Sequence, residues 1–247
     1  MRFEHKEEKM RSKVAFLIAA LMLVPLLATA GIIVGPANYD GSRSTGDGPP
    51  LTVTAADGWS GSGNAGFQIA WHIEEVTDGW SYSYTISGEG GSDLGKALSH
   101  WILEVSEGVD LNLGGDPVSD GPKLFEPSDS SGDQPDMPGN LYGIKWNTTG
   151  EPAIFTTTFT SSQAPIWGDF YAKDGRQGGP GPDKDIFATA WNIGFGTEPT
   201  AADAPFTNWI PTPDTVTVIP EPRSVVAIAA IGVLGLVGLV RQRRRKA

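Results

Sequence analysis

Two neighbouring stretches of the sequence alternate apolar and polar residues with a period of two. The apolar positions of residues 67–73 are Phe67, Ile69, Trp71 and Ile73. Those of residues 80–86 are Trp80, Tyr82, Tyr84 and Ile86. Successive side chains of a β-strand point to opposite faces of the sheet, so this alternation predicts two half-buried strands. The pair Asp78-Gly79 between them favours a tight hairpin turn.

Shorter stretches of the same kind recur along the chain. We expect further strands in residues 101–105, 141–146, 154–160, 167–171, 187–191 and 215–218. No long 3.6-residue periodicity occurs outside the two ends of the chain, and the 32 glycines and 19 prolines suit many turns. The predicted fold class is therefore all-β: an antiparallel, jelly-roll-like β-sandwich over residues 51–218, preceded by an irregular lead-in at residues 31–50.

Composition limits what such a body can bind. The chain has no cysteine, which excludes disulfides, thiolate metal sites and a cysteine nucleophile. Its formal net charge is −11, and within residues 31–219 seven basic residues stand against 25 acidic ones. An acidic surface repels the phosphate backbone, so we expect no nucleic acid among the partners.

The C-terminal end consists of three parts in a fixed order. The tripeptide Pro220-Glu221-Pro222 comes first, and an uncharged apolar run at residues 224–240 follows. As a helix this run spans roughly 25 Å, the short end of what crosses a bilayer. The basic residues of the tail, residues 241–247, are Arg241, Arg243, Arg244, Arg245 and Lys246. The positive-inside rule keeps such a tail in the cytoplasm, which predicts a single transmembrane helix and an exported body.

This combination of Pro-Glu-Pro, a short apolar helix and a terminal arginine cluster closely resembles the PEP-CTERM sorting signal of bacterial secreted proteins. The resemblance covers residues 219–247, with Arg223 in place of the more usual small residue after the tripeptide. It implies cleavage near the tripeptide by an exosortase, an intramembrane cysteine transpeptidase-like enzyme, and transfer to the cell surface or exopolysaccharide matrix. Residues 97–104, 143–146 and 165–175 resemble segments of uncharacterised ectodomains that accompany such tails, and no activity follows from them.

The N-terminal end has the pattern of a secretory signal peptide at residues 1–30. Basic residues precede an apolar stretch at residues 14–27, and Ala28-Thr29-Ala30 is a small-x-small cleavage site. We expect signal peptidase to cut between Ala30 and Gly31. An uncleaved anchor is the alternative, but Pro25 interrupts an apolar stretch that is already short for a bilayer. The precursor is thus expected in the inner membrane with its C-terminus in the cytoplasm.

Residues suited to catalysis or metal binding are few. His72 and His100 are the histidines of the exported body, and no spacing supplies a third metal ligand. Glu104 and Glu107 could each pair with a distant acid, because glycosidases use two carboxylates, but the sequence does not identify that partner. We therefore predict no catalytic residue and no metal ligand.

Two tryptophans and one acidic segment suggest binding. Trp59 and Trp209 lie in turn-like contexts, where an exposed ring would stack on a sugar ring. Residues 114–139 are rich in aspartate and proline, and we expect them to form a loop. Clustered aspartates can bind Ca²⁺, yet no stretch has the fixed ligand spacing of a calcium loop. We expect no cofactor, with Ca²⁺ in the 114–139 loop as the alternative.

The two ends of the chain predict its destination, and the body carries no enzymatic motif. We expect a non-enzymatic surface or extracellular-matrix protein whose partners are signal peptidase, an exosortase, the inner membrane and exopolysaccharide. Two alternatives stay open. The body could be a carbohydrate-binding module that uses Trp59 and Trp209, or a polysaccharide hydrolase that needs two acids in a cleft.

Overall fold

The computed structural model describes residues 31–46, 51–53, 59, 66–114, 120–128, 132–150, 152–175 and 187–213. All of them belong to one compact unit, Gly31–Ala247. The predicted signal peptide, the predicted strand at residues 215–218 and the predicted sorting signal lie outside the described residues. Among the residues that are described, no helix has the length and apolar character needed to cross a membrane.

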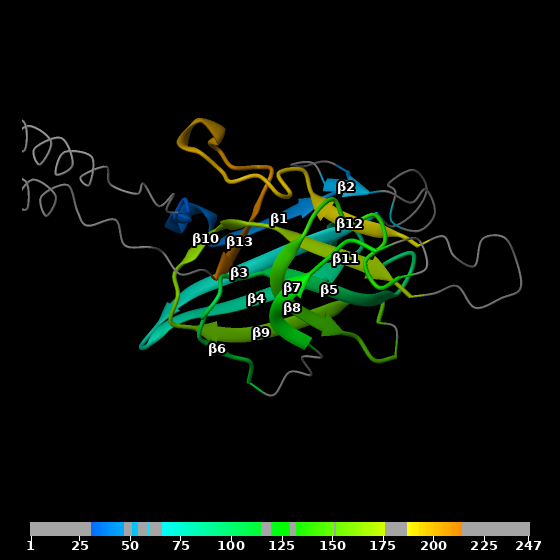
Figure 1. The fold of residues 1–247 in the computed structure, drawn as a ribbon, viewed down its shortest axis with the longest axis horizontal. Coiled ribbons are helices and arrows are strands. Elements are labelled where there is room, and N and C mark those ends of the chain that lie inside the picture. Colours follow the sequence, from blue (N-terminus) through cyan, green and yellow to red (C-terminus); the bar gives the residue numbers. More distant parts are fainter. Residues whose placement is uncertain are drawn as a thin grey trace, which may run out of the picture. The chain divides into compact units, whose positions relative to one another are not determined.

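The described body consists of β-strands joined by turns and short 3-10 helices (Figure 1). Its strands are β1 (Asp40–Ser44), β2 (Leu51–Val53), β3 (Gln68–Val76), β4 (Gly79–Ser87), β5 (Leu98–Glu104), β6 (Leu111–Asn112), β7 (Asp120–Phe125), β8 (Leu141–Asn147), β9 (Phe155–Ser161), β10 (Pro165–Gly168), β11 (Phe170–Asp174), β12 (Thr189–Asn192) and β13 (Ile210–Pro213). The 3-10 helices are η1 (Pro36–Asn38), η2 (Glu89–Gly91) and η4 (Ala201–Asp203). The predicted all-β class is confirmed.

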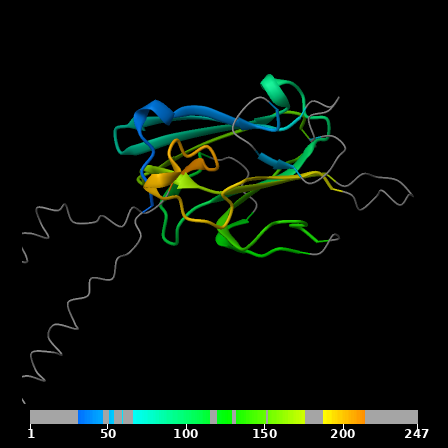
Figure 2. The ribbon, with the colours of Figure 1, turned by 90° about the horizontal axis from the view of Figure 1, so that it is seen from above.

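Two antiparallel sheets hold most of the strands. Their orders are β1-β3-β4-β9-β6 and β2-β12-β11-β5-β8-β7, and β10 pairs with β13 in a separate two-stranded sheet. Figure 2 shows blue β1 in one layer and yellow β12 in the other. Aromatic side chains join the sheets: the ring of Tyr84 in β4 lies 5.5 Å from that of Trp101 in β5, centroid to centroid. The ring of Phe159 in β9 lies 5.7 Å from that of Trp146 in β8.

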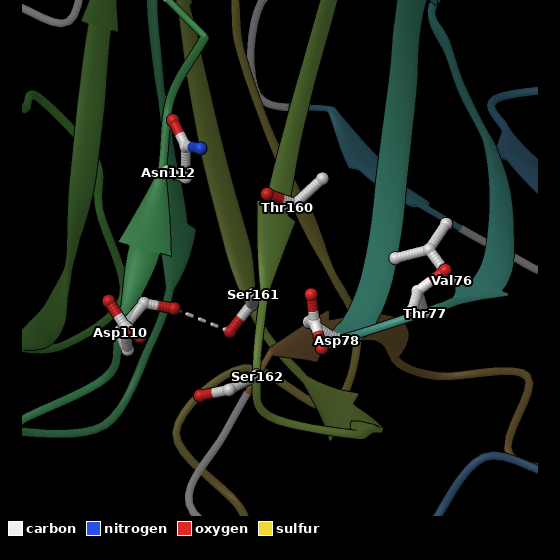
Figure 3. Close-up of a pocket in the computed structure, with 8 residues that line it drawn as sticks. All are labelled: Val76, Thr77, Asp78, Asp110, Asn112, Thr160, Ser161 and Ser162. Carbon is white, nitrogen blue, oxygen red and sulfur yellow. Dashed lines mark hydrogen bonds between the residues drawn. The ribbon is translucent and has the colours of Figure 1, made fainter.

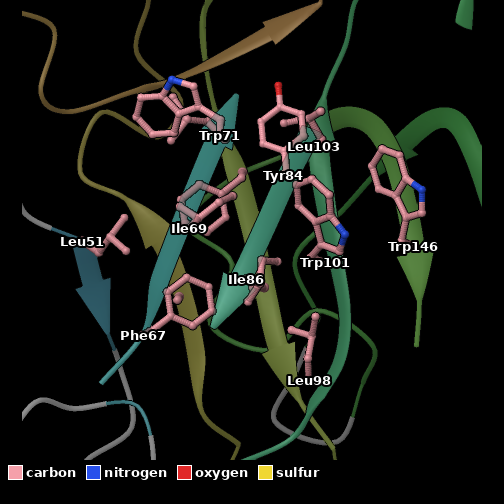
Figure 4. Close-up of a cluster of buried hydrophobic side chains, with 14 of the residues drawn as sticks. Leu51, Phe67, Ile69, Trp71, Tyr84, Ile86, Leu98, Trp101, Leu103 and Trp146 are labelled. Carbon is pink, nitrogen blue, oxygen red and sulfur yellow. The ribbon is translucent and has the colours of Figure 1, made fainter. Parts of the chain in front are cut away.

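The predicted alternation determines which side chains fill the core. The alternating residues Phe67, Ile69, Trp71 and Ile73 are all buried, whereas His72 and Glu74 on the opposite face of β3 are exposed. Figure 4 shows Tyr84 of β4 beside Trp101 of β5, in the core cluster to which both sheets contribute. Each large apolar side chain buried in this way contributes ~1.5–3 kcal/mol. The period-two pattern therefore supplies the contacts that hold the two sheets together.

The predicted hairpin joins β3 and β4, with one change in its turn. The ladder runs to the pair Val76 and Gly79, so the two turn residues are Thr77 and Asp78. Gly79 opens β4 with a φ of 143°. A Cβ atom there would lie 2.3 Å from the carbonyl oxygen of Ser161 in β9. Glycine is needed at this position because the β9 backbone passes so close.

Two segments predicted to be irregular contain strands. The lead-in at residues 31–50 contains β1, which pairs with β3. The expected loop at residues 114–139 contains β7, which forms an edge of the second sheet and pairs with β8. An edge strand has a single partner and is held by backbone hydrogen bonds, so its side chains need not alternate. This is why the sequence pattern did not reveal either strand.

Prolines and one aspartate account for the other differences. The predicted strand at residues 167–171 is divided by Asp169 into β10 and β11. The β13 strand was missed because Pro211 and Pro213 lower the strand propensity of its sequence. In the two-stranded sheet with β10, the β13 strand is an edge strand. Proline has no N–H to donate, so it is tolerated in such an edge strand but not in the interior of a large sheet.

Candidate functional site

Asp169 lies where the chain changes its pairing partners. Before it, β10 pairs with β13, and after it, β11 pairs with β5 and β12. Backbone groups at such a change need partners outside the regular ladder. Glu104, the last residue of β5, supplies two. Its amide donates to the Asp169 carbonyl oxygen at 3.0 Å, and its carboxylate accepts from the Asp169 amide at 2.6 Å.

The side chain of Asp169 is buried and holds the turn that follows β12 in place. Oδ1 accepts a hydrogen bond of 2.6 Å from Nδ2 of Asn192, and Oδ2 accepts one of 2.6 Å from the Gly196 amide. The pKa of Asp169 is raised to about 6, mainly by burial and in smaller part by the negative charge of Glu198, against the opposing effect of these hydrogen bonds. The carboxyl group can therefore gain or lose a proton in mildly acidic solution.

These acids line a pocket of about 220 Å³. Glu104, Asp169 and Glu198 contribute carboxyl groups to its wall, and the exposed Thr197 contributes a hydroxyl. Gly168 allows Glu104 to approach, since a Cβ atom there would lie 2.7 Å from Oε2 of Glu104. Two acids facing a common space can exchange protons with a bound molecule.

A second pocket, of about 310 Å³, lies at the turn of the β3–β4 hairpin (Figure 3). Asp78 from this turn lies on one side of β9, and Asp110 and Asn112, just before and within β6, lie on its other side. The Ser161 hydroxyl of β9 is already engaged, because it donates to the Asp110 carbonyl oxygen at 2.8 Å. The pocket thus offers carboxylate, amide and hydroxyl groups that can hydrogen-bond to a polar ligand.

The expectation that Trp59 and Trp209 are exposed is wrong. Trp59 is 0% and Trp209 is 4% exposed, and both belong to the main core. Each indole N–H also has an internal partner: Nε1 of Trp59 donates to the Lys96 carbonyl oxygen at 2.8 Å, and Nε1 of Trp209 donates to that of Thr197 at 3.0 Å. Their local turns are covered by the rest of the body, so neither ring is free to stack on a sugar.

The histidines are far from equivalent. His72 is exposed, as predicted, and Nδ1 lies 2.5 Å from Oδ1 of Asp40. This hydrogen bond to Asp40 raises the pKa of His72. His100 is buried within β5, and burial lowers the pKa of its imidazole, with the positive charges of Lys145 and Lys173 acting in the same direction.

The structure places Glu104 and Glu107, and part of the acidic segment at residues 114–139, but not the predicted sorting residues. Glu104 faces the acidic pocket together with Asp169, whereas Glu107 is exposed and is not among the residues that line this pocket. Within the described part of residues 114–139, and of the whole body, no three histidine or acidic side chains group as metal ligands. The sorting residues Pro220, Glu221, Pro222, Arg241, Arg243, Arg244 and Arg245 lie outside the described residues.

Sequence reasoning missed Asp169 and Asn192. One signal was available, because Gly168 and Asp169 interrupt the apolar residues of the predicted strand at residues 167–171. A charged residue in such a strand indicates either a break or a specific partner. The partner, Asn192, could not be identified because it is 23 residues away and is brought close by sheet pairing.

Comparisons with known proteins do not identify a relative with a similar site. No family model, no curated protein and no solved structure matches the chain.

Proposed function

We propose that the protein is a non-enzymatic, exported surface or extracellular-matrix protein of a bacterium, sorted by a PEP-CTERM signal and processed by an exosortase. The observation that supports this most is the pair of end signals in the sequence, residues 1–30 and residues 219–247, between which all described strands lie. The first described β-contact of the body is the bridge between Ile33 and Ile166, and its last described strand, β13, ends at Pro213. Cuts after Ala30 and near Pro220 would therefore leave every described strand intact.

The proposed route has two membrane steps. Signal peptidase acts on residues 1–30, and the helix at residues 224–240 holds the precursor in the inner membrane with its C-terminus in the cytoplasm. An exosortase then transfers the body to the cell surface or to the extracellular matrix, where exopolysaccharide surrounds it. We further propose that the body is a β-sandwich with jelly-roll-like connections, which the two antiparallel sheets and their shared core support.

The intact mass of the protein recovered from the cell surface tests this proposal. We expect a product that begins at Gly31 and ends near the Pro220-Glu221-Pro222 tripeptide. The same protein from cells without the exosortase is the control, and it should keep residues 224–247. A surface form that retains residues 224–247 in normal cells would refute the processing step.

The acidic pocket favours one second candidate, a polysaccharide hydrolase. Glu104 and Asp169 face one pocket, and the pKa of Asp169 is raised to about 6, which suits an acid that donates a proton. Release of reducing ends from matrix polysaccharide by the wild type, and its loss in Glu104→Gln, would establish this reading. No release by either protein would leave the non-enzymatic proposal in place.

A carbohydrate-binding module is the less supported alternative. Its two predicted contact residues, Trp59 and Trp209, are buried. A binding function of this kind would need other residues, and the polar pocket at the β3–β4 turn is where we would look first. Retention of the body on immobilised exopolysaccharide measures such binding directly.

A further inference from the structure

A lysine and an aspartate form a buried pair at one end of the second sheet. Asp174 is the last residue of β11, and its side chain is 0% exposed. Lys96 precedes β5, and its side chain is 12% exposed. Nζ of Lys96 lies 3.3 Å from Oδ2 of Asp174. The two side chains are thus in direct contact and almost completely shielded from water.

The backbone fixes both residues in this position. The ladder between β11 and β5 shifts its register at Asp174, which places this residue opposite Leu98 of the core. The next residue, Gly175, donates its amide to the Ala97 carbonyl oxygen at 3.0 Å. On the other side, the Trp59 indole holds the Lys96 carbonyl oxygen. Groups held at contact distance in this way react as if at very high concentration.

The pair is poorly satisfied as an ordinary ion pair. The Lys96 ammonium is near Oδ2 of Asp174 but is not aligned for a full hydrogen bond. Burial raises the pKa of Asp174, although a hydrogen bond from the Ala188 backbone and the positive charge of Lys96 oppose this shift. A buried pair of charges loses its hydration. Transfer of one proton from Lys96 to Asp174 removes both charges and leaves a neutral amine beside a neutral carboxylic acid.

We propose that the side chains of Lys96 and Asp174 join in an intramolecular isopeptide bond. The lone pair of the neutral Nζ attacks Cγ of Asp174, and a new N–C bond forms. The C–OH bond of the carboxylic acid then breaks, and its hydroxyl leaves with a proton from the nitrogen as one molecule of water. Nothing is oxidised or reduced, and no co-reactant is needed.

The other lysine–aspartate pairs of the described body lack this environment. Nζ of Lys145 lies 3.7 Å from Oδ2 of Asp133, but the Asp133 side chain is 82% exposed. Lys123 and Asp120 pair at the surface, where both side chains are about half exposed. In water a carboxylate stays charged and is a poor acceptor for an amine. Among the ion pairs of the described residues, the reaction is therefore expected at the pair formed by Lys96 and Asp174 alone.

The bond would serve as a staple in a chain that has no cysteine for disulfides. It links the segment before β5 to the end of β11, two strands that are neighbours in the sheet and distant in sequence. Because a covalent link restricts the unfolded chain, it would make unfolding harder, as a disulfide does. Unlike a disulfide, such a bond is not broken by reducing agents.

Trypsin digestion of the denatured full chain tests the proposal. Amide formation blocks cleavage at Lys96, so residues 44–123 should be released uncut and joined to residues 174–176, with a mass lower by one water. Lys96→Arg keeps the positive charge but cannot form the bond, and should release residues 174–176 free. Lys145→Arg is the matched control and should keep the joined peptide.

Two results would overturn the proposal. One is a wild-type digest that contains the free peptides 44–96 and 174–176 and no joined product, which would show an ordinary ion pair. The other is a joined peptide that persists in Lys96→Arg. The digest reports on residues 44–176 alone, so its outcome does not depend on whether the tail is processed.

Discussion

Asp169 is a residue whose titration should be visible in the stability of the body. Its pKa is raised from 3.8 to about 6 in the folded protein, mainly by burial. The folded state therefore binds a proton more tightly than the unfolded chain does. The contribution of Asp169 to stability is largest below about pH 4. It falls as the pH rises to about 6, by ~3 kcal/mol at most.

Asp169→Asn removes this titration while it keeps the size of the side chain. We expect the free energy of unfolding of the variant, relative to that of the wild type, to improve steadily between pH 4 and pH 7. Urea unfolding of both proteins across this range measures the difference, and common effects of the other carboxylates cancel. A difference that is the same at pH 4 and pH 7 would show that Asp169 does not titrate there.

Trp59 was predicted to contact a sugar, but the structure places its ring in the core. Its ring lies 4.8 Å from that of Phe67, centroid to centroid, and its indole N–H is bonded within the body. We expect Trp59→Ala to lower the free energy of unfolding by ~3–5 kcal/mol, the usual cost of emptying an aromatic core position. Trp59→Phe should cost less because it keeps most of the volume. Unchanged stability of Trp59→Ala in urea unfolding would contradict the burial of this ring.

At the scale of elements, strands were predicted most accurately from the sequence where one face of the strand is buried and the other is exposed. The hairpin of β3 and β4 was predicted because one face is core and the other is solvent. The buried strands β5 and β8 were also found, since their apolar runs are unmistakable. The edge strand β1 and the proline-containing β13 were not, because backbone pairing alone defines them. Local sequence does not encode which distant strand supplies that pairing.

The same limit explains the acidic pocket. Glu104 was named as one of two acids without a partner, and the structure supplies Asp169 from a strand junction 65 residues away. Sheet topology brings the two together, and topology is a property of the whole body. The register of strands that are distant in sequence follows from packing rather than from local pattern.

Gly79 offers a test of how tightly the β3–β4 hairpin packs on β9. An alanine there combines a strained φ of 143° with a contact of 2.3 Å to the Ser161 carbonyl oxygen. Gly90→Ala is a matched control, because Gly90 has a φ of 68° and nothing within 4 Å of a Cβ atom. We expect Gly90→Ala to cost ~1–2 kcal/mol, the penalty of a left-handed conformation. Gly79→Ala should cost more. Equal midpoints in urea unfolding would contradict the close approach.

At the scale of the whole molecule, the proposed sorting route gives the acidic body and the basic ends separate tasks. The net positive charge of the chain is confined to the two ends, and the body between them is strongly acidic. A body of this charge would stay soluble after the proposed release. The five basic residues that follow the apolar run should fix orientation, because moving each arginine through the hydrocarbon core costs roughly 2.5–3.5 kcal/mol.

Replacement of Arg241, Arg243, Arg244, Arg245 and Lys246 by serine tests this division of tasks. Without these charges the predicted apolar helix at residues 224–240 should hold the membrane less firmly, so more full-length precursor should enter the periplasm and less body should reach the surface. Immunoblots of periplasmic, membrane and surface fractions measure the distribution, and Lys123→Ser, a charge removed from the body, is the control. If the substituted protein is anchored and cleaved like the wild type, the basic tail is not part of the signal. The sorting proposal would then depend on Pro220-Glu221-Pro222 and the helix alone.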